Sequence, residues 1–256
     1  MTAARDEAPV TLRRLLPEPA SLTADEAASQ LRFAEGAPQG RPFVALNMVA
    51  TVDGRASVAG RTAPISSVAD RQLFMALRTS VDAVMVGAGT ARTERYGRLV
   101  RDPRRRELRA AAGLEPDPLA IVVSARLDLP ADLPLLRDAA SRIVVITASE
   151  ASLAPCPARV EYLRSRPVDL ADALARLRRE HGVRSILCEG GPNLNASLFA
   201  EGLVDELFLT TVPKLAGRAG ALTISGEAPL GEPLDARLLW LLERDGELFA
   251  RYGIVS

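Results

Sequence analysis

Short apolar strands alternate with helical patterns along most of this chain, and that alternation restricts its fold more than any other feature. The predicted strands are apolar on both faces, as in DAVMVG and RIVVIT, which is typical of strands buried on both sides. They favour a parallel sheet with helices on both faces, because each crossover brings a helix back over the sheet. The predicted strands are residues 43–52, 82–87, 119–124, 142–147, 160–163, 183–189 and 205–212, and the main predicted helices are residues 68–79, 168–181 and 192–201.

The first 40 residues differ from the rest of the chain. Ser21 or Thr23 can cap a short helix at residues 24–33, and the EGAPQG run that follows breaks the pattern. No repeat and no linker is recognised after that point. The sequence therefore predicts an N-terminal extension at residues 1–40 and a single α/β domain at residues 41–256.

A hairpin signal stands near the end of the chain. Arg244-Asp245-Gly246 separates two apolar segments, residues 238–242 and 247–255, which predicts antiparallel strands there. The LLWLL run at 238–242 is too apolar for a free sheet edge, and this favours a homodimer interface. Burial of the same run in the core explains it equally well.

The charged residues balance, which excludes several classes of function. Lys and Arg number 32, Asp and Glu also number 32, and Lys214 is the only lysine. Because nucleic-acid-binding proteins normally carry a basic excess, no nucleic-acid partner is expected. One His and two Cys cannot form a Cys/His zinc site of the usual kinds, so no metal is predicted. No leader and no apolar run of about 18 residues is recognised, which predicts a reduced, cytoplasmic protein with no membrane partner.

Two glycine-rich turns follow predicted strands and open predicted helices. VGAGT at residues 86–90 follows one strand, and EGGPNLN at residues 189–195 follows another. Glycines at such turns let a ligand approach the backbone, and the first N–H groups of the helix can bind an anion. Each turn alone can equally be a tight connection. Because parallel strands end at one edge of a sheet, the two turns together predict a binding site for a pyrophosphate.

Two further strand ends carry polar residues. Thr51 and Asp53 stand at the end of the first strand of the domain, where Asp-Gly usually indicates a turn but can also place both side chains beside the site. Ser124 and Arg126 stand at the end of the LAIVVS strand. A hydroxyl and a guanidinium suit a 2′-phosphate better than a free ribose hydroxyl, which favours NADPH over NADH.

In order along the chain, these motifs resemble the pyrimidine reductase family of the riboflavin pathway, the reductase domain of the bifunctional deaminase-reductase. The resemblance covers residues 41–221 and rests on RPFVALNMVATVDGRAS, on VDAVMVGAGT and on ILCEGGPNLNASLFAEGLVDELFLTTVPKLAG. It implies a dihydrofolate-reductase-like fold with a mainly parallel central sheet. It also implies NADPH-dependent hydride transfer to the ribosyl group of 5-amino-6-(5-phosphoribosylamino)uracil.

The glycine turns, the strand ends and the resemblance together predict the residues of a cofactor site. The protein needs mainly to orient the reactants there, because the cofactor carries the hydride. The predicted NADPH-binding residues are Val49, Pro64, Gly87, Gly89, Thr90, Ser124, Arg126, Gly190, Gly191, Pro192, Asn193, Leu194, Asn195 and Ser197.

The resemblance also implies a substrate site for a phosphorylated pyrimidine. Substrate contacts are implied for Asn47, Thr62, Arg78, Arg101 and Glu189, and the two guanidinium groups can hold a phosphate. A proton must reach the reduced group as well. Asp53 is a candidate for that acid or for orienting a water molecule, and Glu94 is a second candidate because it stands at an acidic position of the family.

The chain departs from the family pattern in two places. It has no His-x-Glu with a later Cys-x-x-Cys, so no zinc deaminase is expected. The family's "D-D-P-x-L-T-V-R" segment reads ERYGRLVR at residues 94–101, with Arg95 for a carboxylate and Tyr96 for the proline. Residues 98–117, rich in charge, predict a solvated helix or loop, or else a charged wall beside a phosphate. Two alternatives therefore stay open: a dihydrofolate or pteridine reductase, and a non-catalytic NADPH-binding protein.

Overall fold

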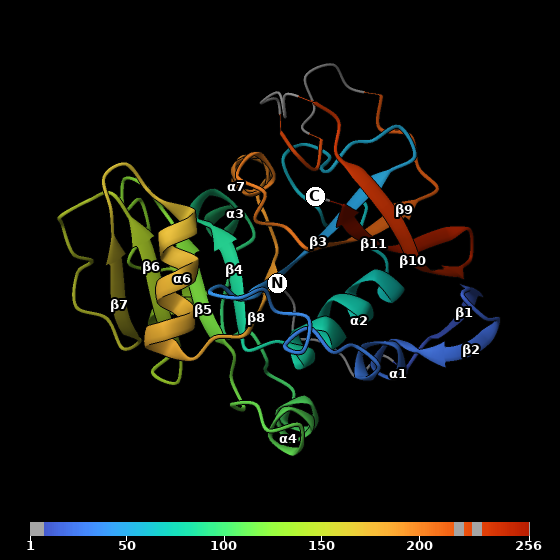
Figure 1. Ribbon diagram of the computed structural model, residues 1–256, viewed down its shortest axis with the longest axis horizontal. Helices are drawn as coiled ribbons and strands as arrows, with labels where there is room; N and C mark the ends of the chain where they lie inside the picture. Colours follow the sequence, from blue (N-terminus) through green and yellow to red (C-terminus); the bar gives the residue numbers. More distant parts are fainter. Residues whose placement is uncertain (1–7, 218–222, 227–231, 256) are drawn as a thin grey trace.

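The computed structural model describes residues 8–217, 223–226 and 232–255, so the last residues of the family resemblance, 218–221, lie outside its description. Within the described residues, eleven strands form one sheet (Figure 1). In spatial order these are β2 (Ala20–Thr23), β1 (Thr11–Leu16), β10 (Asp235–Arg244), β11 (Glu247–Val255), β9 (Glu206–Val212), β3 (Phe43–Thr51), β8 (Ser185–Cys188), β4 (Ala83–Gly87), β5 (Leu119–Val123), β6 (Arg142–Thr147) and β7 (Arg159–Arg164).

The centre of the sheet is parallel and one side of it is antiparallel. Strands β9, β3, β8, β4, β5, β6 and β7 run in one direction. The pairs β11–β9, β10–β11, β1–β10 and β1–β2 are antiparallel, and β10 with β11 forms the predicted C-terminal hairpin. The predicted α/β fold class is thereby confirmed.

Side chains of the central strands alternate between two hydrophobic cores, one on each face of the sheet. In β4, Val84 and Val86 pack into the first core, and Ala83 and Met85 pack into the second. Burial on both sides is the reason why these strands are apolar throughout. The first core is covered by α1 (Ala24–Ser29), α2 (Val68–Leu77), α3 (Ala88–Thr93) and α5 (Pro134–Arg137), and the second by α6 (Leu170–His181) and α7 (Pro192–Ala200).

Local signals explain where the long helices begin and end. The sequence offers Ser66 or Ser67 as the cap of α2, and the structure has Ser67, whose Oγ accepts a hydrogen bond from Asp70 N at 3.0 Å. α6 ends where the sequence predicts, at Gly182, whose φ of 67° is the left-handed conformation that favours glycine.

The N-terminal residues contribute two strands that the sequence pattern does not predict. β1 pairs with β2 on one side and with β10 on the other. Thr23 caps α1, which ends at Ser29 rather than at residue 33. Leu12 and Leu22 pack into the first core. Residues 11–29 are therefore part of the main sheet and its core, while a domain boundary at residue 40 stays a prediction.

β10 is not an edge strand, which corrects one reason for expecting a homodimer. It lies between β1 and β11, and its Trp240 and Leu242 are buried in the first core. Core packing therefore explains the apolar LLWLL run, and the homodimer stays a prediction without that support.

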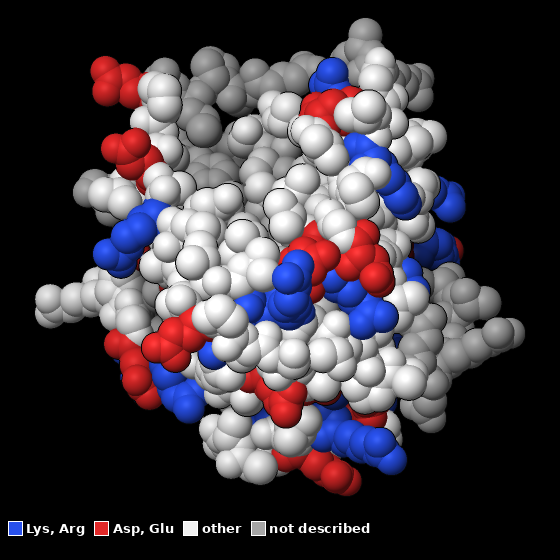
Figure 2. Space-filling view, turned by 90° about the vertical axis from the view of Figure 1, so that its right-hand side faces the viewer, with Lys and Arg blue, Asp and Glu red and all other residues white. Residues whose placement is uncertain are grey.

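Charged side chains of both signs lie close together on the surface. Figure 2 shows the side of the molecule where β10 and β1 lie, and there blue and red atoms adjoin one another between uncharged areas. Of the charge-rich residues 98–117, α4 (Pro103–Ala111) is largely exposed, as predicted, but its Arg109 is fully buried. None of the helices in the described ranges is both long and apolar enough to cross a membrane.

Candidate active site

The candidate site lies at the edge of the sheet where four neighbouring parallel strands end. Leu46 of β3 is opposite Cys188 of β8, Cys188 is opposite Met85 of β4, and Gly87 is opposite Val123 of β5. The residues that follow β8, β4 and β5 therefore meet at the carboxyl ends of these strands, while β3 passes them and continues to Thr51. Figure 1 shows α3 and α7 at this edge and α4 at the opposite end of the strands. The structure thus brings the two predicted glycine turns together.

The two glycine turns are in direct contact. Gly87 N donates a hydrogen bond to Gly190 O at 2.7 Å, and a methyl group on Gly191 would lie 2.5 Å from Thr90 Oγ1. Neither α3 nor α7 has a side-chain cap at its start, so N–H groups of their first turns remain for a ligand. A methyl group on Gly89 would meet no atom within 4 Å. This edge can therefore accept a bulky anionic group close to the backbone.

Asn195 and Leu194 support the second turn from inside the protein. The Asn195 side chain is fully buried, and its Nδ2 donates to Ile224 O at 2.7 Å and lies 3.2 Å from Met48 Sδ. Leu194 is buried in the second core. Their side chains therefore support the turn from the protein side, and cofactor binding by the backbone at these two positions stays a prediction. Pro192 is half-buried, and Asn193 and Ser197 are exposed.

The end of β5 presents a guanidinium group. Ser124 is buried, and its Oγ accepts a hydrogen bond from Asp128 N at 3.0 Å. Arg126 is exposed and makes no hydrogen bond or ion pair with the described residues. Of the predicted pair, Ser124 shapes the turn, and Arg126 is the group available to an anion.

Arg78 and Glu189 form a buried ion pair. Arg78 begins the short helix η1 (Arg78–Ser80), and its Nε and Nη2 each donate to one oxygen of Glu189 at 2.7 Å. Arg78 Nη1 donates to Leu99 O at 2.8 Å. The exposed fractions of the two side chains are 9% and 1%. Arg78 is therefore held by Glu189 and Leu99, and its predicted contact with the substrate stays a prediction.

Tyr96 belongs to this group, and the sequence does not identify it as a site residue. Its hydroxyl donates to Glu189 Oε2 at 2.7 Å. Burial and the charge of Glu189 raise the pKa of the Tyr96 phenol well above its ordinary value, so it remains a donor. One sequence feature could have identified Tyr96: it lies in the segment that differs from the pattern of the resemblance. A tyrosine next to Arg95 is also typical of an ordinary loop, so this feature alone does not indicate a site residue.

Asp53 holds the loop that follows β9. Its carboxylate accepts hydrogen bonds from the Thr51 hydroxyl, from Ala216 N at 3.2 Å and from Gly217 N at 2.8 Å. These hydrogen bonds lower the pKa of Asp53 to about 2, and the bond from the Thr51 hydroxyl has the largest effect. Asp53 is therefore ionised at neutral pH, which corrects its predicted role as the acid. Its other predicted role, orienting a water molecule, stays a prediction.

Glu94 and Lys214 fix the loop between β3 and α2. Glu94 Oε1 accepts hydrogen bonds from Thr62 N at 3.1 Å and Thr62 Oγ1 at 3.0 Å. Lys214 Nζ donates to Pro64 O at 2.8 Å. Pro64 is exposed and Val49 is buried, so of these two predicted cofactor residues only Pro64 presents its side chain freely.

The side chains of Arg101 and Asn47 have no polar partner within the described residues. Neither makes a side-chain hydrogen bond or ion pair with the described residues. Arg101 is exposed, and its guanidinium lies against Gly97, where a methyl group would overlap Nη2. Asn47 is half-buried in β3. Both remain available to a substrate.

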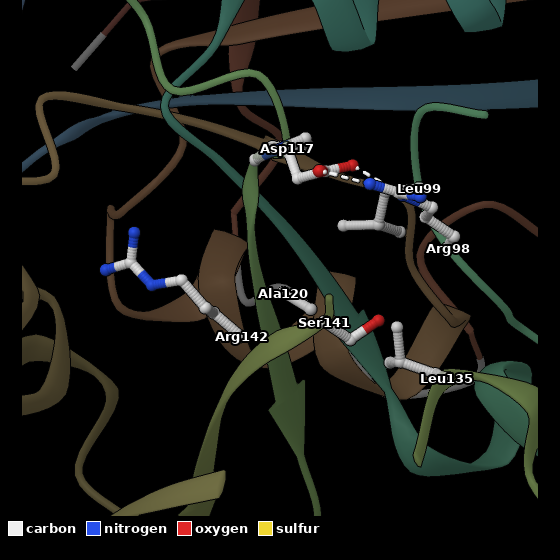
Figure 3. A pocket seen from close by; sticks show the side chains of 8 residues that line it. Arg98, Leu99, Asp117, Ala120, Leu135, Ser141 and Arg142 are labelled. Atoms are coloured by element: carbon white, nitrogen blue, oxygen red, sulfur yellow. Dashed lines mark hydrogen bonds and ion pairs between the residues drawn. The ribbon is translucent and has the colours of Figure 1, made fainter. Parts of the chain in front are cut away.

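Two small hollows lie at the other end of the strands. The one in Figure 3 is bordered by Arg98, Asp117, Leu135 and Ser141, and its volume of about 10 Å³ is at the limit for one water molecule. The second, of about 70 Å³, is bordered by Asp82, Glu115 and His181 among others. Neither has room for a nucleotide, so the candidate site is the edge with the glycine turns.

We expect Gly191→Ala to destabilise the protein and weaken cofactor binding. The new methyl group would lie 2.5 Å from Thr90 Oγ1, so Thr90 must move out of the position it holds beside the turn. Overpacking of this kind costs roughly 1–3 kcal/mol. Thermal unfolding and titration with NADPH measure the two effects.

Two further variants control this prediction. Thr90→Ala combined with Gly191→Ala removes the overlapping atom, so the melting temperature should recover towards that of the Thr90→Ala variant. Gly89→Ala meets no atom of the protein and lies inside α3, so its melting temperature should equal or exceed that of the wild type. An unchanged melting temperature in Gly191→Ala would show that the contact with Thr90 is not tight.

The chain is similar to known reductases in sequence and in fold. A family model described as the RibD C-terminal domain matches residues 42–242. The 2,5-diamino-6-ribosylamino-4(3H)-pyrimidinone 5′-phosphate reductase of Archaeoglobus fulgidus is 33% identical over 216 residues, which cover 82% of this chain and 96% of the relative. The protein of the same name from Methanothermobacter thermautotrophicus is 33% identical over 205 residues, which cover 77% and 89%. A pyrimidine reductase-like protein of Corynebacterium diphtheriae shares the fold, with a TM-score of 0.72 at 22% identity over 92% of this chain and 100% of that one.

Proposed function

Since the chain belongs to the RibD C-terminal domain family, we propose that it is the riboflavin-pathway oxidoreductase that reduces the sugar of a ribosylaminopyrimidine 5′-phosphate. The observation that supports this most is the direct contact of the two glycine turns, the second of which directly follows Glu189, because it offers a place for a pyrophosphate beside a carboxylate that can bind the pyrimidine. The relatives with 33% identity are named for the 2,5-diaminopyrimidinone, which favours that substrate over its deaminated form, 5-amino-6-(5-phosphoribosylamino)uracil.

The residues at the glycine turns fit a nicotinamide dinucleotide. Gly87 and Gly191 let the two turns pack against each other, Gly89 leaves open space where a pyrophosphate would lie, and the first turn of α7 supplies N–H groups. When bound, the cofactor supplies the hydride. The reductase family implies a nicotinamide cofactor, and we propose NADPH because the exposed Arg126 is suited to a 2′-phosphate.

Four side chains of the substrate half are proposed to position the pyrimidine phosphate. Arg101 binds the phosphate, since its guanidinium is exposed and without a partner in the described chain. Asn47 and Glu189 bind polar groups of the substrate from β3 and from the end of β8. Glu94 holds Thr62 in place and is the remaining candidate for the proton donor. The small-molecule substrate, a cytoplasmic location and a homodimer complete the proposal.

We expect Arg126→Ala to remove the preference for NADPH. The KM for NADPH should rise roughly 10- to 100-fold while the KM for NADH stays unchanged, because only NADPH carries the phosphate that the guanidinium binds. Arg159→Ala is the matched control, because Arg159 is an exposed arginine at the start of β7, at the opposite end of the strands. An equal rise in KM for NADPH and for NADH would show that Arg126 does not bind the 2′-phosphate.

The function is tested by offering three substrates to the purified protein with NADPH. These are the 2,5-diaminopyrimidinone ribosyl phosphate, its deaminated form and dihydrofolate, and loss of nicotinamide absorbance reports turnover. Turnover of either pyrimidine supports the proposal, and their ratio of kcat/KM gives the preferred ring. Turnover of dihydrofolate alone would indicate a pteridine reductase, and tight NADPH binding without any turnover would indicate a non-catalytic protein.

A further inference from the structure

The Glu189 carboxylate has about four acceptor positions, and three of them are occupied by the protein. Oε1 accepts one hydrogen bond, from Arg78 Nε, and Oε2 accepts two, from Arg78 Nη2 and from the Tyr96 hydroxyl. Oε2 is therefore filled, and Oε1 retains one open position. Without the Tyr96 hydroxyl, each oxygen would have one open position and a donor could bind the carboxylate in two ways.

Tyr96 is held firmly enough to select between the two oxygens. Its backbone N donates to Ala91 O at 2.9 Å, and its backbone O accepts from Leu135 N at 2.9 Å. The Arg78 guanidinium carbon lies 5.6 Å from the centre of the Tyr96 ring, so the ring is also packed against the ion pair. The hydroxyl is thus a donor with a fixed position.

The same side chain connects the two halves of the site. Tyr96 follows α3, which begins at the first glycine turn, and it precedes Gly97, on which the Arg101 guanidinium lies. Its partner Glu189 directly precedes the second glycine turn.

We infer that Tyr96 is a positioning residue. Its hydroxyl occupies the remaining acceptor position on Oε2 of Glu189, so a donor group of the substrate can bind only at Oε1. This role rests on the proposed function, because the donor belongs to the ribosylaminopyrimidine phosphate. Tyr96 does not touch the cofactor turn through its hydroxyl. Its loss therefore affects recognition of the pyrimidine and leaves the affinity for NADPH as it is.

The experiment compares Tyr96→Phe with the wild type and with Tyr162→Phe. Tyr162 is the matched control because its hydroxyl also forms a hydrogen bond, accepting from Leu153 N at 2.8 Å, but lies in β7 at the far edge of the sheet. Loss of a hydrogen bond to a charged group predicts a roughly 10- to 100-fold rise in KM for the pyrimidine in Tyr96→Phe. The Kd for NADPH should stay within about twofold, and Tyr162→Phe should match the wild type.

A double-mutant cycle tests whether Tyr96 acts through Glu189. In the Glu189→Gln background, Tyr96→Phe should add less than about a threefold further rise in KM, because the carboxylate with two equivalent oxygens is no longer there. A KM equal to that of the wild type in Tyr96→Phe, or a full additional rise in the Glu189→Gln background, would overturn the inference. If the wild type itself turns over no pyrimidine, the proposed function fails instead, so the two failures are distinguishable.

A measurement that keeps residue 96 as a tyrosine covers the case in which Tyr96→Phe does not fold. With 3-fluorotyrosine incorporated, the ¹⁹F resonance of Tyr96 can be assigned by elimination from Tyr162→Phe and Tyr252→Phe. It should shift when the pyrimidine phosphate is added without NADPH. An unchanged resonance at saturating pyrimidine would overturn the inference.

Discussion

Arg101→Ala is expected to raise the KM for the pyrimidine phosphate about 100-fold or more and to change kcat little. Each charge-assisted hydrogen bond contributes roughly 1.5–3 kcal/mol, and a guanidinium can form two with a phosphate. Arg101 is exposed and has no hydrogen bond or ion pair within the described chain, so these donors are not used elsewhere. The phosphate does not react, so its binding contributes equally before and during the reaction, and KM carries the effect. Steady-state kinetics with varied pyrimidine measures it.

Two variants control the Arg101 prediction. Arg104→Ala removes another exposed arginine that has no side-chain ion pair in the described chain, three residues further on, and should leave KM unchanged. Gly97→Ala keeps Arg101 but displaces it, because the new methyl group overlaps the flexible end of the guanidinium. Its KM should rise with little loss of stability. An unchanged KM in Arg101→Ala would remove Arg101 from the substrate site.

Arg109→Ala is expected to lower the free energy of unfolding by about 3–5 kcal/mol, from lost hydrogen bonds and from the cavity it leaves. Arg109 is fully buried, and it joins α4 to the end of η1. Its Nη1 donates to Arg78 O at 2.6 Å and Val81 O at 2.7 Å, and its Nε donates to Glu115 O at 2.8 Å. Burial lowers the pKa of Arg109 to about 10, so the side chain is still charged at neutral pH. Its loss leaves three carbonyl groups without this donor and a cavity in their midst.

Arg109→Met separates the hydrogen bonds from the volume. Methionine fills much of the space but donates nothing, so most of the loss of stability should remain. Arg104→Ala, in the same helix but exposed, is the control for helix propensity and should change stability by less than about 0.5 kcal/mol. Denaturant unfolding measures all three variants. A loss below about 1 kcal/mol in Arg109→Ala would show that the three contacts contribute little.

The parallel centre of the sheet could be predicted because burial on both sides leaves a strong pattern. DAVMVG and RIVVIT are apolar at every position that faces either core, and β6 has the predicted limits, Arg142–Thr147. The N-terminal strands leave no such pattern. β1 has only one fully buried side chain, Leu12, and its two arginines are adjacent, so the sequence TLRRLL does not show the alternation of apolar and polar residues that predicts a strand.

The position of β10 could not be predicted without β1. LLWLL looks exposed only if the hairpin ends the sheet, and β1 covers that edge through pairing across more than 200 positions of sequence, as between Arg13 and Glu243. Long-range pairing of this kind depends on backbone contacts that no local pattern records. The same reasoning applies to Arg109, whose sequence surroundings are highly charged although the folded chain buries it.

In the candidate site, the sequence predicts which residues lie close together but not which of them form hydrogen bonds or ion pairs with one another. The two glycine turns meet as expected because both follow parallel strands. Arg78 and Glu189 are each a plausible substrate ligand when considered alone, yet they satisfy each other. The three donors around the Asp53 carboxylate come partly from residues more than 160 positions away, so its low pKa could not be anticipated.

We propose that a hydride passes from a nicotinamide cofactor to the sugar of the pyrimidine phosphate at the carboxyl ends of these strands. NADPH deuterated on the transferring face of the nicotinamide tests this directly, with mass spectrometry of the product. The wild type is expected to yield a product that carries one deuterium in its ribityl chain, and Arg101→Ala is expected to give a much lower yield at limiting pyrimidine. A product without deuterium, or deuterium found only in added dihydrofolate, would contradict it.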